Sequence, residues 1–166
     1  MKCVSKKCVF YADCYNRAME EKHIELIARA VIIHEGAILL CKPIADDYFF
    51  FPGGHVEFDE DSIAALKREI KEEVDGIVID TRFIGILENQ FSQDGERKHE
   101  MNIVFESQLA SPEIHVLEDH IECMWVPLAE FKEARVLPVS LKERVIQWMQ
   151  DKQVFFGSEK NERKLM

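Results

Sequence analysis

Residues 51–76 form the most informative stretch of the chain: F-P-G-G-H-V-E-F-D-E-D-S-I-A-A-L-K-R-E-I-K-E-E-V-D-G. A Pro-Gly-Gly turn leads through a short acidic loop into a segment with helical periodicity. Asp61 is the expected N-cap of that helix, because its carboxylate can accept the first free backbone N–H groups. Apolar residues recur at spacings of three and four, which predicts one buried helix face. These residues are Ile63, Leu66, Ile70 and Val74.

Three glutamates follow one another on this helix at positions i, i+3 and i+4. They are Glu69, Glu72 and Glu73, and this spacing places them on adjoining surface. Like charges so close together repel, and a bound cation would offset the repulsion. Hard cations such as Mg²⁺ or Mn²⁺ prefer oxygen ligands. The alternative is an ordinary solvated helix face, because charged helix faces usually have no further role.

The spacing of the residues around the glutamates is more specific than the cluster alone. Gly54 stands six residues before Glu60, and Glu60 stands eight before Arg68, which opens an R-E-I-K-E-E run. This pattern resembles the Nudix box, G-x5-E-x7-R-E-U-x-E-E-x-G-U, in which U is a bulky aliphatic residue. The matching residues are Gly54, Glu60, Arg68, Glu69, Ile70, Glu72 and Glu73.

The end of the box departs from the family pattern. Asp75 stands where the family has glycine, and Gly76 stands where it has an aliphatic residue. The glycine normally closes the helix in a left-handed conformation. We expect the helix to run one residue longer and to close on Gly76. The alternative is that Asp75 itself adopts the left-handed conformation at some energetic cost.

The remaining pattern predicts strands and helices on both sides of the box. We expect strands over 24–34, 37–42, 48–51, 77–89, 101–109 and 121–128, a hairpin loop over 90–98, a loop over 111–120 and a helix over 138–151. This order resembles the α/β Nudix fold, an α/β/α sandwich with a mixed central sheet. The resemblance implies an N-terminal extension (1–22), a Nudix hydrolase domain (23–152) and a polar, frayed C-terminal tail (153–166).

Composition limits the class of protein and its partners. The chain has 166 residues, 47% hydrophobic and 31% charged, and a formal net charge of −10. This length favours one domain, and the acidic balance argues against binding long DNA or RNA through phosphates. We see neither a membrane-spanning run nor a signal peptide, so we expect a cytoplasmic protein. In that compartment the five cysteines would be reduced thiols.

Three of the cysteines lie in the first 22 residues. Cys3, Cys8 and Cys14 are separated by four and five residues, with His23 further along. A small zinc site is one interpretation, although the spacing is not the paired C-x2-C type. The other interpretation is a short extension with free thiols.

The Nudix resemblance implies a metal site built on the box. The carbonyl of Gly53 and the carboxylates of Glu69, Glu72 and Glu73 would hold Mg²⁺ (or Mn²⁺), and one nearby carboxylate would deprotonate the attacking water. Arg68 would orient the acidic cluster through charge-assisted hydrogen bonds. In that scheme Glu60 is a structural partner of Arg68 or of the loop.

Further residues are implied outside the box. Many family members add a carboxylate from the loop before the W-V strand, and Glu118 is preferred to Glu122 for this role. Glu100 is a weaker candidate for the general base. Arg29 and Lys42 would meet substrate phosphates, or would be ordinary basic residues of the sheet.

The implied reaction is hydrolysis of a diphosphate linkage in a nucleoside diphosphate joined to a group X. Phe91 and Ser92 stand where ADP-ribose hydrolases often have proline, and the region where dinucleoside polyphosphate hydrolases often show tyrosine holds Gln93-Asp94-Gly95. These differences favour a nucleoside triphosphate or modified nucleotide, as in MutT-like pyrophosphohydrolases. Three alternatives stay open: an ADP-ribose or nucleotide-sugar pyrophosphatase, a catalytically silent nucleotide-binding module, and a structural protein. Many relatives are dimers, which leaves a homodimer open.

Overall fold

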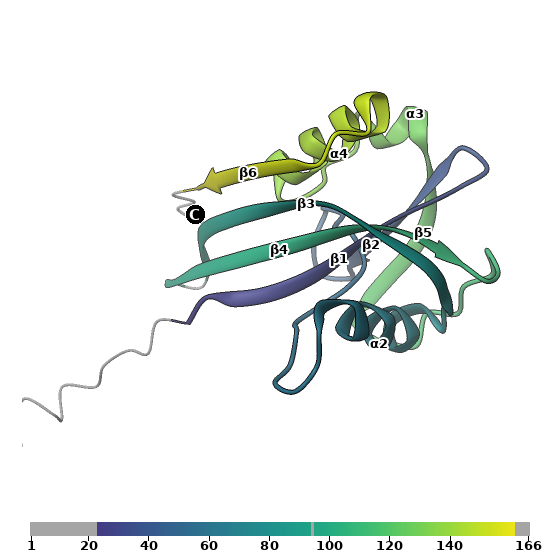
Figure 1. Ribbon diagram of the computed structural model, residues 1–166, viewed down its shortest axis with the longest axis horizontal. Coiled ribbons are helices and arrows are strands. Elements are labelled where there is room, and N and C mark those ends of the chain that lie inside the picture. The colour runs from purple at the N-terminus through teal and green to yellow at the C-terminus, as the bar shows by residue number, and fades with distance from the viewer. Residues whose placement is uncertain (1–22, 94, 162–166) are drawn as a thin grey trace, which may run out of the picture.

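A mixed β-sheet with helices on both faces makes up the fold (Figure 1). The computed structural model describes residues 23–93 and 95–161. The strand order is β5-β2-β1-β4-β3-β6. The pairs β1·β4 and β3·β6 are parallel and the other neighbours are antiparallel. The expected α/β/α sandwich with a mixed central sheet is therefore confirmed.

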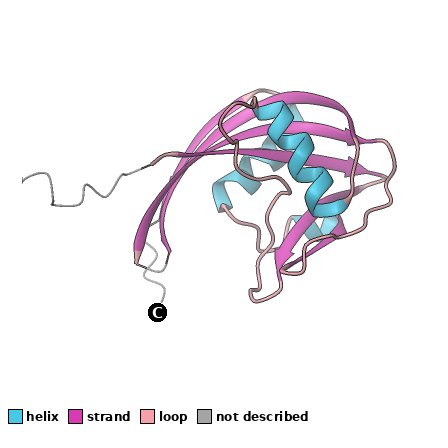
Figure 2. Ribbon diagram, turned by 90° about the horizontal axis from the view of Figure 1, so that it is seen from below, coloured by secondary structure: helices cyan, strands magenta, loops and turns pink. Residues whose placement is uncertain are grey.

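The elements follow one another as β1 (Glu25–His34), β2 (Ala37–Pro43), α2 (Ser62–Val74), β3 (Val78–Gln93), β4 (Glu96–Leu109), β5 (Ile121–Pro127), α3 (Leu128–Phe131), α4 (Val139–Asp151) and β6 (Phe155–Lys160). Seen from below, the long strands curve strongly, and α2 lies across the near face of the sheet (Figure 2). The predicted zinc site of Cys3, Cys8 and Cys14 lies outside the described residues.

The first hairpin shows why its sequence folds locally. Glu35 and Gly36 both have positive φ, 44° and 79°, which suits the twist of a two-residue turn between antiparallel strands. The turn places Ile33 opposite Ile38 and His34 opposite Ala37. The predicted hairpin is confirmed.

Each face of the sheet buries its own hydrophobic cluster. On the face covered by α2, Ala28, Ala30 and Ile32 of β1 pack against Leu66 and Ile70 of the helix. The small alanines let the helix approach the strand closely. On the opposite face, the residues packed together come from the sheet and from α3 and α4, and include Val31, Leu87, Val104, Phe131, Leu141 and Trp148. The sheet is therefore buried on both sides, and the box helix packs on it through its residues from Ala65 to Val74.

Two predicted boundaries around the sheet were wrong. The hairpin expected as a loop over 90–98 is mostly strand, because β3 continues to Gln93 and β4 begins at Glu96. Polar residues there still pair across the ladder, as Gln90 does with His99. The aromatic segment 48–51 contributes only isolated bridges, Cys41 with Phe50 and Phe49 with Val136.

The C-terminal segment is not a frayed tail over its whole length. Residues Phe155–Lys160 form β6, which pairs in parallel with β3 from Gly85 to Gln90. Alternate residues of β6 are buried, including Gly157 and Glu159. The buried face of β6 holds this segment in the sheet. That face is buried only because β6 pairs with β3, which lies far away in the chain.

Two of the five cysteines form a disulfide, so the expectation of reduced thiols was wrong for this pair. Cys41 of β2 and Cys123 of β5 lie directly opposite each other in the antiparallel ladder, with Cα atoms 4.0 Å apart. Their separation of 82 residues in sequence hid the pairing from any local pattern.

Among the described residues, no helix is long and apolar enough to cross a bilayer.

Candidate active site

The box loop is inserted between β1 and β2, where these strands separate. Backbone N–H groups of Ala28 and Ala30 in β1 donate to Gly54 O and Pro52 O, both at 2.9 Å. Gly53 has φ of 119°, and a Cβ there would lie 2.2 Å from the carbonyl oxygen of Ala28. Only glycine fits this position, so the loop is fixed against the strand.

The start of the box helix follows the prediction. Asp61 Oδ1 accepts the N–H groups of Ile63 at 3.0 Å and Ala64 at 2.8 Å, which satisfies two donors of the first turn. The predicted inner stripe is confirmed for Leu66, Ile70 and Val74, but Ile63 is 39% exposed. Ile63 is not part of the buried cluster, so the packed stripe begins one turn later in the helix.

The end of the helix corrects our expectation. Asp75, not Gly76, takes the left-handed position, with φ 55° and ψ 22°. Its N–H donates to Lys71 O and the Gly76 N–H donates to Ile70 O, the bonding pattern that usually closes on glycine. Lys71 also pairs with the Asp75 carboxylate. Asp75 therefore closes the helix at the box position, and the preceding glutamates keep their helical register.

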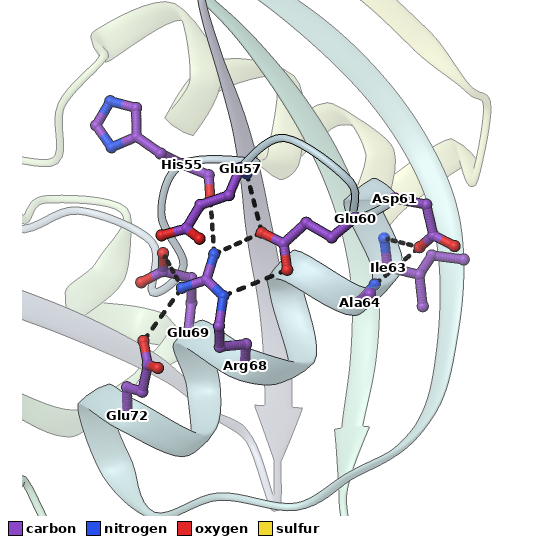
Figure 3. A network of polar contacts seen from close by, with 9 residues as sticks. All are labelled: His55, Glu57, Glu60, Asp61, Ile63, Ala64, Arg68, Glu69 and Glu72. Atoms are coloured by element: carbon purple, nitrogen blue, oxygen red, sulfur yellow. Dashed lines mark hydrogen bonds and ion pairs between the residues drawn. The ribbon is translucent and has the colours of Figure 1, made fainter.

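Arg68 joins three carboxylates of the box (Figure 3). It reaches Glu60 through Nη2 at 2.6 Å, and Nη1 contacts Glu69 at 2.8 Å and Glu72 at 3.1 Å. Nη2 also donates to His55 O at 3.0 Å. The hydrogen bond from Arg68 holds the pKa of Glu60 below its usual range. The predicted partnership of Glu60 with Arg68 is confirmed, and the single positive charge of Arg68 offsets part of the negative charge of the three carboxylates.

Gly54 makes room for the carboxylate of Glu69. A Cβ on Gly54 would lie 2.4 Å from Glu69 Cδ and 2.5 Å from both of its oxygens. The loop backbone at Gly54 and the carboxylate of Glu69 are therefore in direct contact. This contact gives a physical reason for glycine at the first position of the box, and it places Glu69 beside the Gly53 peptide.

Glu73 is the buried carboxylate of the site. Its residue is only 5% exposed, and Oε2 accepts the Gly53 N–H at 2.9 Å. Burial raises the pKa of Glu73 to about 8, and the charges of Glu69 and Glu118 add to the rise, while the Gly53 N–H and Arg29 oppose it. A carboxyl group with a pKa raised this far by burial and neighbouring acids is a candidate functional group.

The loop before β5 brings Glu118 toward this carboxylate. The N–H of Leu117 donates to Glu73 O at 3.0 Å, and the N–H of His115 donates to Val74 O at 3.0 Å. These bonds satisfy helix C-terminal carbonyls and dock the loop on α2. Glu118 is near enough to raise the pKa of Glu73. Glu122, its alternative, is exposed on β5 opposite Lys42.

Arg29 lies under the box loop. Its Nη1 donates to Phe51 O at 3.1 Å and to Gly53 O at 2.6 Å. Burial lowers the pKa of Arg29, and the charges of Glu100, Glu73 and Glu69 oppose that shift. The structure thus brings Arg29 to the box, where it binds backbone carbonyls.

The other predicted site residues lie in different settings. Lys42 pairs with Asp47 at 3.6 Å, and within residues 23–93 and 95–161 no contact joins it to the box carboxylates. Glu100 Oε2 accepts hydrogen bonds from Asn89 at 3.2 Å and from Asn102 at 3.4 Å. Its half-buried carboxylate therefore lies against these two amides.

Asn102 is a site-forming residue that the sequence reading missed. It is fully buried on β4 and its Oδ1 accepts from Arg29 Nε at 3.3 Å. The available signal was a polar residue inside the apolar strand M-N-I-V-F. A buried amide needs hydrogen-bonding partners, and here they are Arg29 and Glu100.

The donor set fits a hard divalent cation in chemistry and in backbone placement. Gly53 O and the box carboxylates are oxygen ligands of the kind that Mg²⁺ takes. As the side chains stand, Glu69 and Glu72 turn toward Arg68, and no group of three His, Cys, Asp or Glu residues converges as a metal site among the described residues. Binding a cation would require these two carboxylates to rotate from Arg68 toward Glu73.

A separate hollow of about 600 Å³ lies at the far end of β1 and β4. Its walls include His34, Trp125 and the ion pair of Arg82 with Glu106 at 2.6 Å. The box loop contacts β1 near Ala28, several residues before His34. None of the residues that line the hollow belongs to the box.

Comparison with known proteins agrees with this geometry. A family model described as the NUDIX domain matches residues 25–149. The chain belongs to the Nudix family. Members are typically pyrophosphohydrolases that act on small nucleotides, and the family is generally dependent on a divalent metal. No match was found among curated protein sequences.

Solved structures share the Nudix fold with this chain. A MutT protein from Bacillus halodurans has a TM-score of 0.72 at 18% identity, covering 86% of this chain and 94% of its own. A MutT Nudix hydrolase from Burkholderia pseudomallei has 0.63 at 24%, covering 74% and 98%. An ADP-ribose pyrophosphatase from Streptococcus suis has 0.58 at 17%, covering 82% and 100%. At these identities the likeness shows the fold alone.

Proposed function

We propose that this Nudix protein hydrolyses a diphosphate linkage in a nucleoside triphosphate or modified nucleotide, with Mg²⁺ as cofactor. The observation that carries the proposal is the buried Glu73 carboxylate, which accepts the Gly53 N–H at 2.9 Å beside other acidic groups. A substrate with several phosphates would otherwise be repelled by this acidic site. Bound Mg²⁺ would screen those phosphates, stabilise developing charge and make water more acidic.

Five groups are proposed to hold the cation: Gly53 O, Glu69, Glu72, Glu73 and Glu118. Arg68 keeps Glu69 and Glu72 close to each other while neutralising part of their repulsion. One of the box carboxylates, or a neighbouring glutamate, accepts the proton of the attacking water. A general base must lie within hydrogen-bond reach of that water, and both Glu69 and Glu73 contact the glycine turn.

The test is release of phosphate or pyrophosphate from a panel of nucleotides with and without Mg²⁺. We expect one nucleoside triphosphate or modified nucleotide to be hydrolysed only with the metal. Glu72→Gln and Glu73→Gln should each lower kcat by about a hundredfold or more, the loss of a few kcal/mol of transition-state stabilisation. Full rates in both variants would contradict the assignment.

A nucleotide-binding module without activity is the second candidate. The observation that favours it is the pairing of Glu69 and Glu72 with Arg68, which leaves them turned from Glu73. Inactivity toward the whole panel, together with micromolar binding of a nucleotide, would support this candidate. Preferential cleavage of ADP-ribose or a nucleotide sugar would instead change the proposed substrate class, while the proposed reaction, hydrolysis of a diphosphate linkage, would stand.

A further inference from the structure

The guanidinium of Arg29 joins the interior of the sheet to the glycine turn of the box. On one side, Nη1 donates to Gly53 O at 2.6 Å and Phe51 O at 3.1 Å. On the other, Nε donates to Asn102 Oδ1 at 3.3 Å. We propose that Arg29 is a positioning residue that sets the Gly53 peptide groups for cation binding, an inference that rests on the proposed metal-dependent function. Arg29 would then act through the protein backbone and not on substrate phosphate.

The hydrogen bonds behind Arg29 fix its orientation. Asn102 is fully buried, and its Nδ2 donates to Glu100 Oε2 at 3.4 Å. Asn89 Nδ2 donates to the same oxygen at 3.2 Å. These three residues come from neighbouring strands β3 and β4, so the acceptor that holds Arg29 Nε is itself held by the sheet. Buried networks of this kind are rigid when their members are satisfied.

The hydrogen bonds in front of Arg29 end at the metal site. Gly53 accepts from Arg29 through its carbonyl and donates to Glu73 through its N–H at 2.9 Å. Both polar groups of one glycine are therefore fixed, one by the sheet interior and one by the box helix. Because Gly53 has φ of 119°, its conformation depends on such contacts. A shift of Arg29 would move a carbonyl ligand and release the N–H partner of Glu73.

The two other roles for Arg29 predict different results. A phosphate-binding arginine would change the KM for nucleotide and leave the affinity of the protein for free Mg²⁺ unchanged. If Arg29 acted only as a positive charge that repels the cation, its removal would tighten Mg²⁺ binding. A positioning role predicts weaker Mg²⁺ binding when Arg29 is replaced. The affinity would fall even in a variant that keeps the charge, because the hydrogen bond to Gly53 O would be lost.

Arg29→Lys separates these roles because lysine keeps the charge and loses the planar fork. Mg²⁺ is titrated calorimetrically into the nucleotide-free protein, and kcat and KM are then measured at saturating Mg²⁺. We expect Mg²⁺ affinity to fall about tenfold or more, as for residues that orient metal ligands, with a lower kcat and an unchanged KM. Arg29→Gln should weaken Mg²⁺ binding at least as much.

Matched variants control for stability and for charge. Arg82→Lys alters an exposed arginine that pairs with Glu106 at the far end of the sheet, and it should leave Mg²⁺ affinity unchanged. If Arg29→Lys does not fold, Asn102→Ala keeps Arg29 but removes its Nε acceptor, together with the amide that donates to Glu100, and should also weaken Mg²⁺ binding.

Hydrogen exchange of the Gly53 amide gives a readout that needs neither metal nor substrate. In Arg29→Lys or Asn102→Ala this exchange should become about tenfold faster or more, while the α4 amides keep their rates. Unchanged exchange, unchanged Mg²⁺ affinity with a raised KM, or tighter binding in Arg29→Gln would each overturn the proposal. A wild-type protein that binds no Mg²⁺ and cleaves no nucleotide would instead refute the proposed function, and the exchange rates would still test the positioning.

Discussion

Glu72 and Glu73 are adjacent glutamates on one helix, yet their surroundings are opposite. The Glu72 side chain is 53% exposed and pairs with Arg68 at 3.1 Å. Glu73 is 5% exposed and accepts one backbone N–H from Gly53. The first carboxylate contacts an arginine whose single positive charge it shares with Glu60 and Glu69. The second lacks such a partner in contact among the described residues, so it is the one that most favours a cation.

Activity should show the largest contrast. Glu73→Gln is expected to lower kcat by about a hundredfold or more, because the carboxylate in direct contact with the glycine turn is lost. Glu143→Gln, on exposed α4, is the matched control and should keep the wild-type rate. The assay is Mg²⁺-dependent phosphate or pyrophosphate release. Equal losses of kcat in both variants would point to a general effect of charge and would contradict a specific role of Glu73 in the reaction.

The stability of the metal-free protein should depend on pH through Glu73. The pKa of Glu73 rises from 4.5 unfolded to about 8 folded because of its burial. The folded state therefore holds this proton more tightly, and the free energy of unfolding falls as pH rises from 4.5 to about 8. The loss is on the order of a few kcal/mol.

Chemical unfolding of the wild type and of Glu73→Gln over this pH range measures that loss. The difference in unfolding free energy between the two proteins should move in favour of the variant as pH increases. A constant difference would mean that Glu73 is ionised in the folded protein throughout the range.

Gly54→Ala should disturb Glu69 specifically. The added Cβ would lie 2.4 Å from Glu69 Cδ, so the carboxylate must move. We expect Mg²⁺ affinity to fall about tenfold, as for other losses of ligand placement. Gly95→Ala is the control: Gly95 has φ of 83° and open space around it, so alanine there strains the turn between β3 and β4, outside the box. A drop in Mg²⁺ affinity for Gly95→Ala alone would contradict this view of the glycine.

Arg68→Gln should lower kcat less than Glu73→Gln does, because Arg68 contacts the more exposed carboxylates of the box. Three carboxylates lose their shared partner, but these groups can still be solvated. We expect kcat to fall about tenfold, equivalent to about 1.4 kcal/mol. Steady-state kinetics at saturating Mg²⁺ measures the change. A loss as large as that of Glu73→Gln would place Arg68 at the centre of the chemistry.

Local pattern was enough to predict much of this molecule. The Asp61 cap, the Glu35-Gly36 hairpin and the helix after Pro138 depend on neighbouring residues, and the structure confirms each. These three features could be predicted because their physical causes lie within about one helical turn or one tight turn. The Nudix resemblance, in addition, implied that Glu60 is a partner of Arg68 or of the loop, and the structure shows the contact with Arg68.

The features that were missed depend on distant segments. Strand β6 exists because it pairs with β3, and the Cys41–Cys123 disulfide joins strands separated by most of the domain. The deep burial of Glu73 requires the inserted loop and the docked segment before β5. The Asp75 cap shows a different limit, since the sequence allowed two helix endings and the observed one places Lys71 in contact with the Asp75 carboxylate.

Calorimetric titration of Mg²⁺ into the nucleotide-free protein at pH 7 tests the central claim most directly. Runs in buffers with different ionisation enthalpies report how many protons are released. Because the pKa of Glu73 is about 8, we expect Mg²⁺ binding to release about one proton, and Glu73→Gln to bind more weakly without that release. Equal affinity and equal proton release in the two proteins would contradict a cation site built on Glu73.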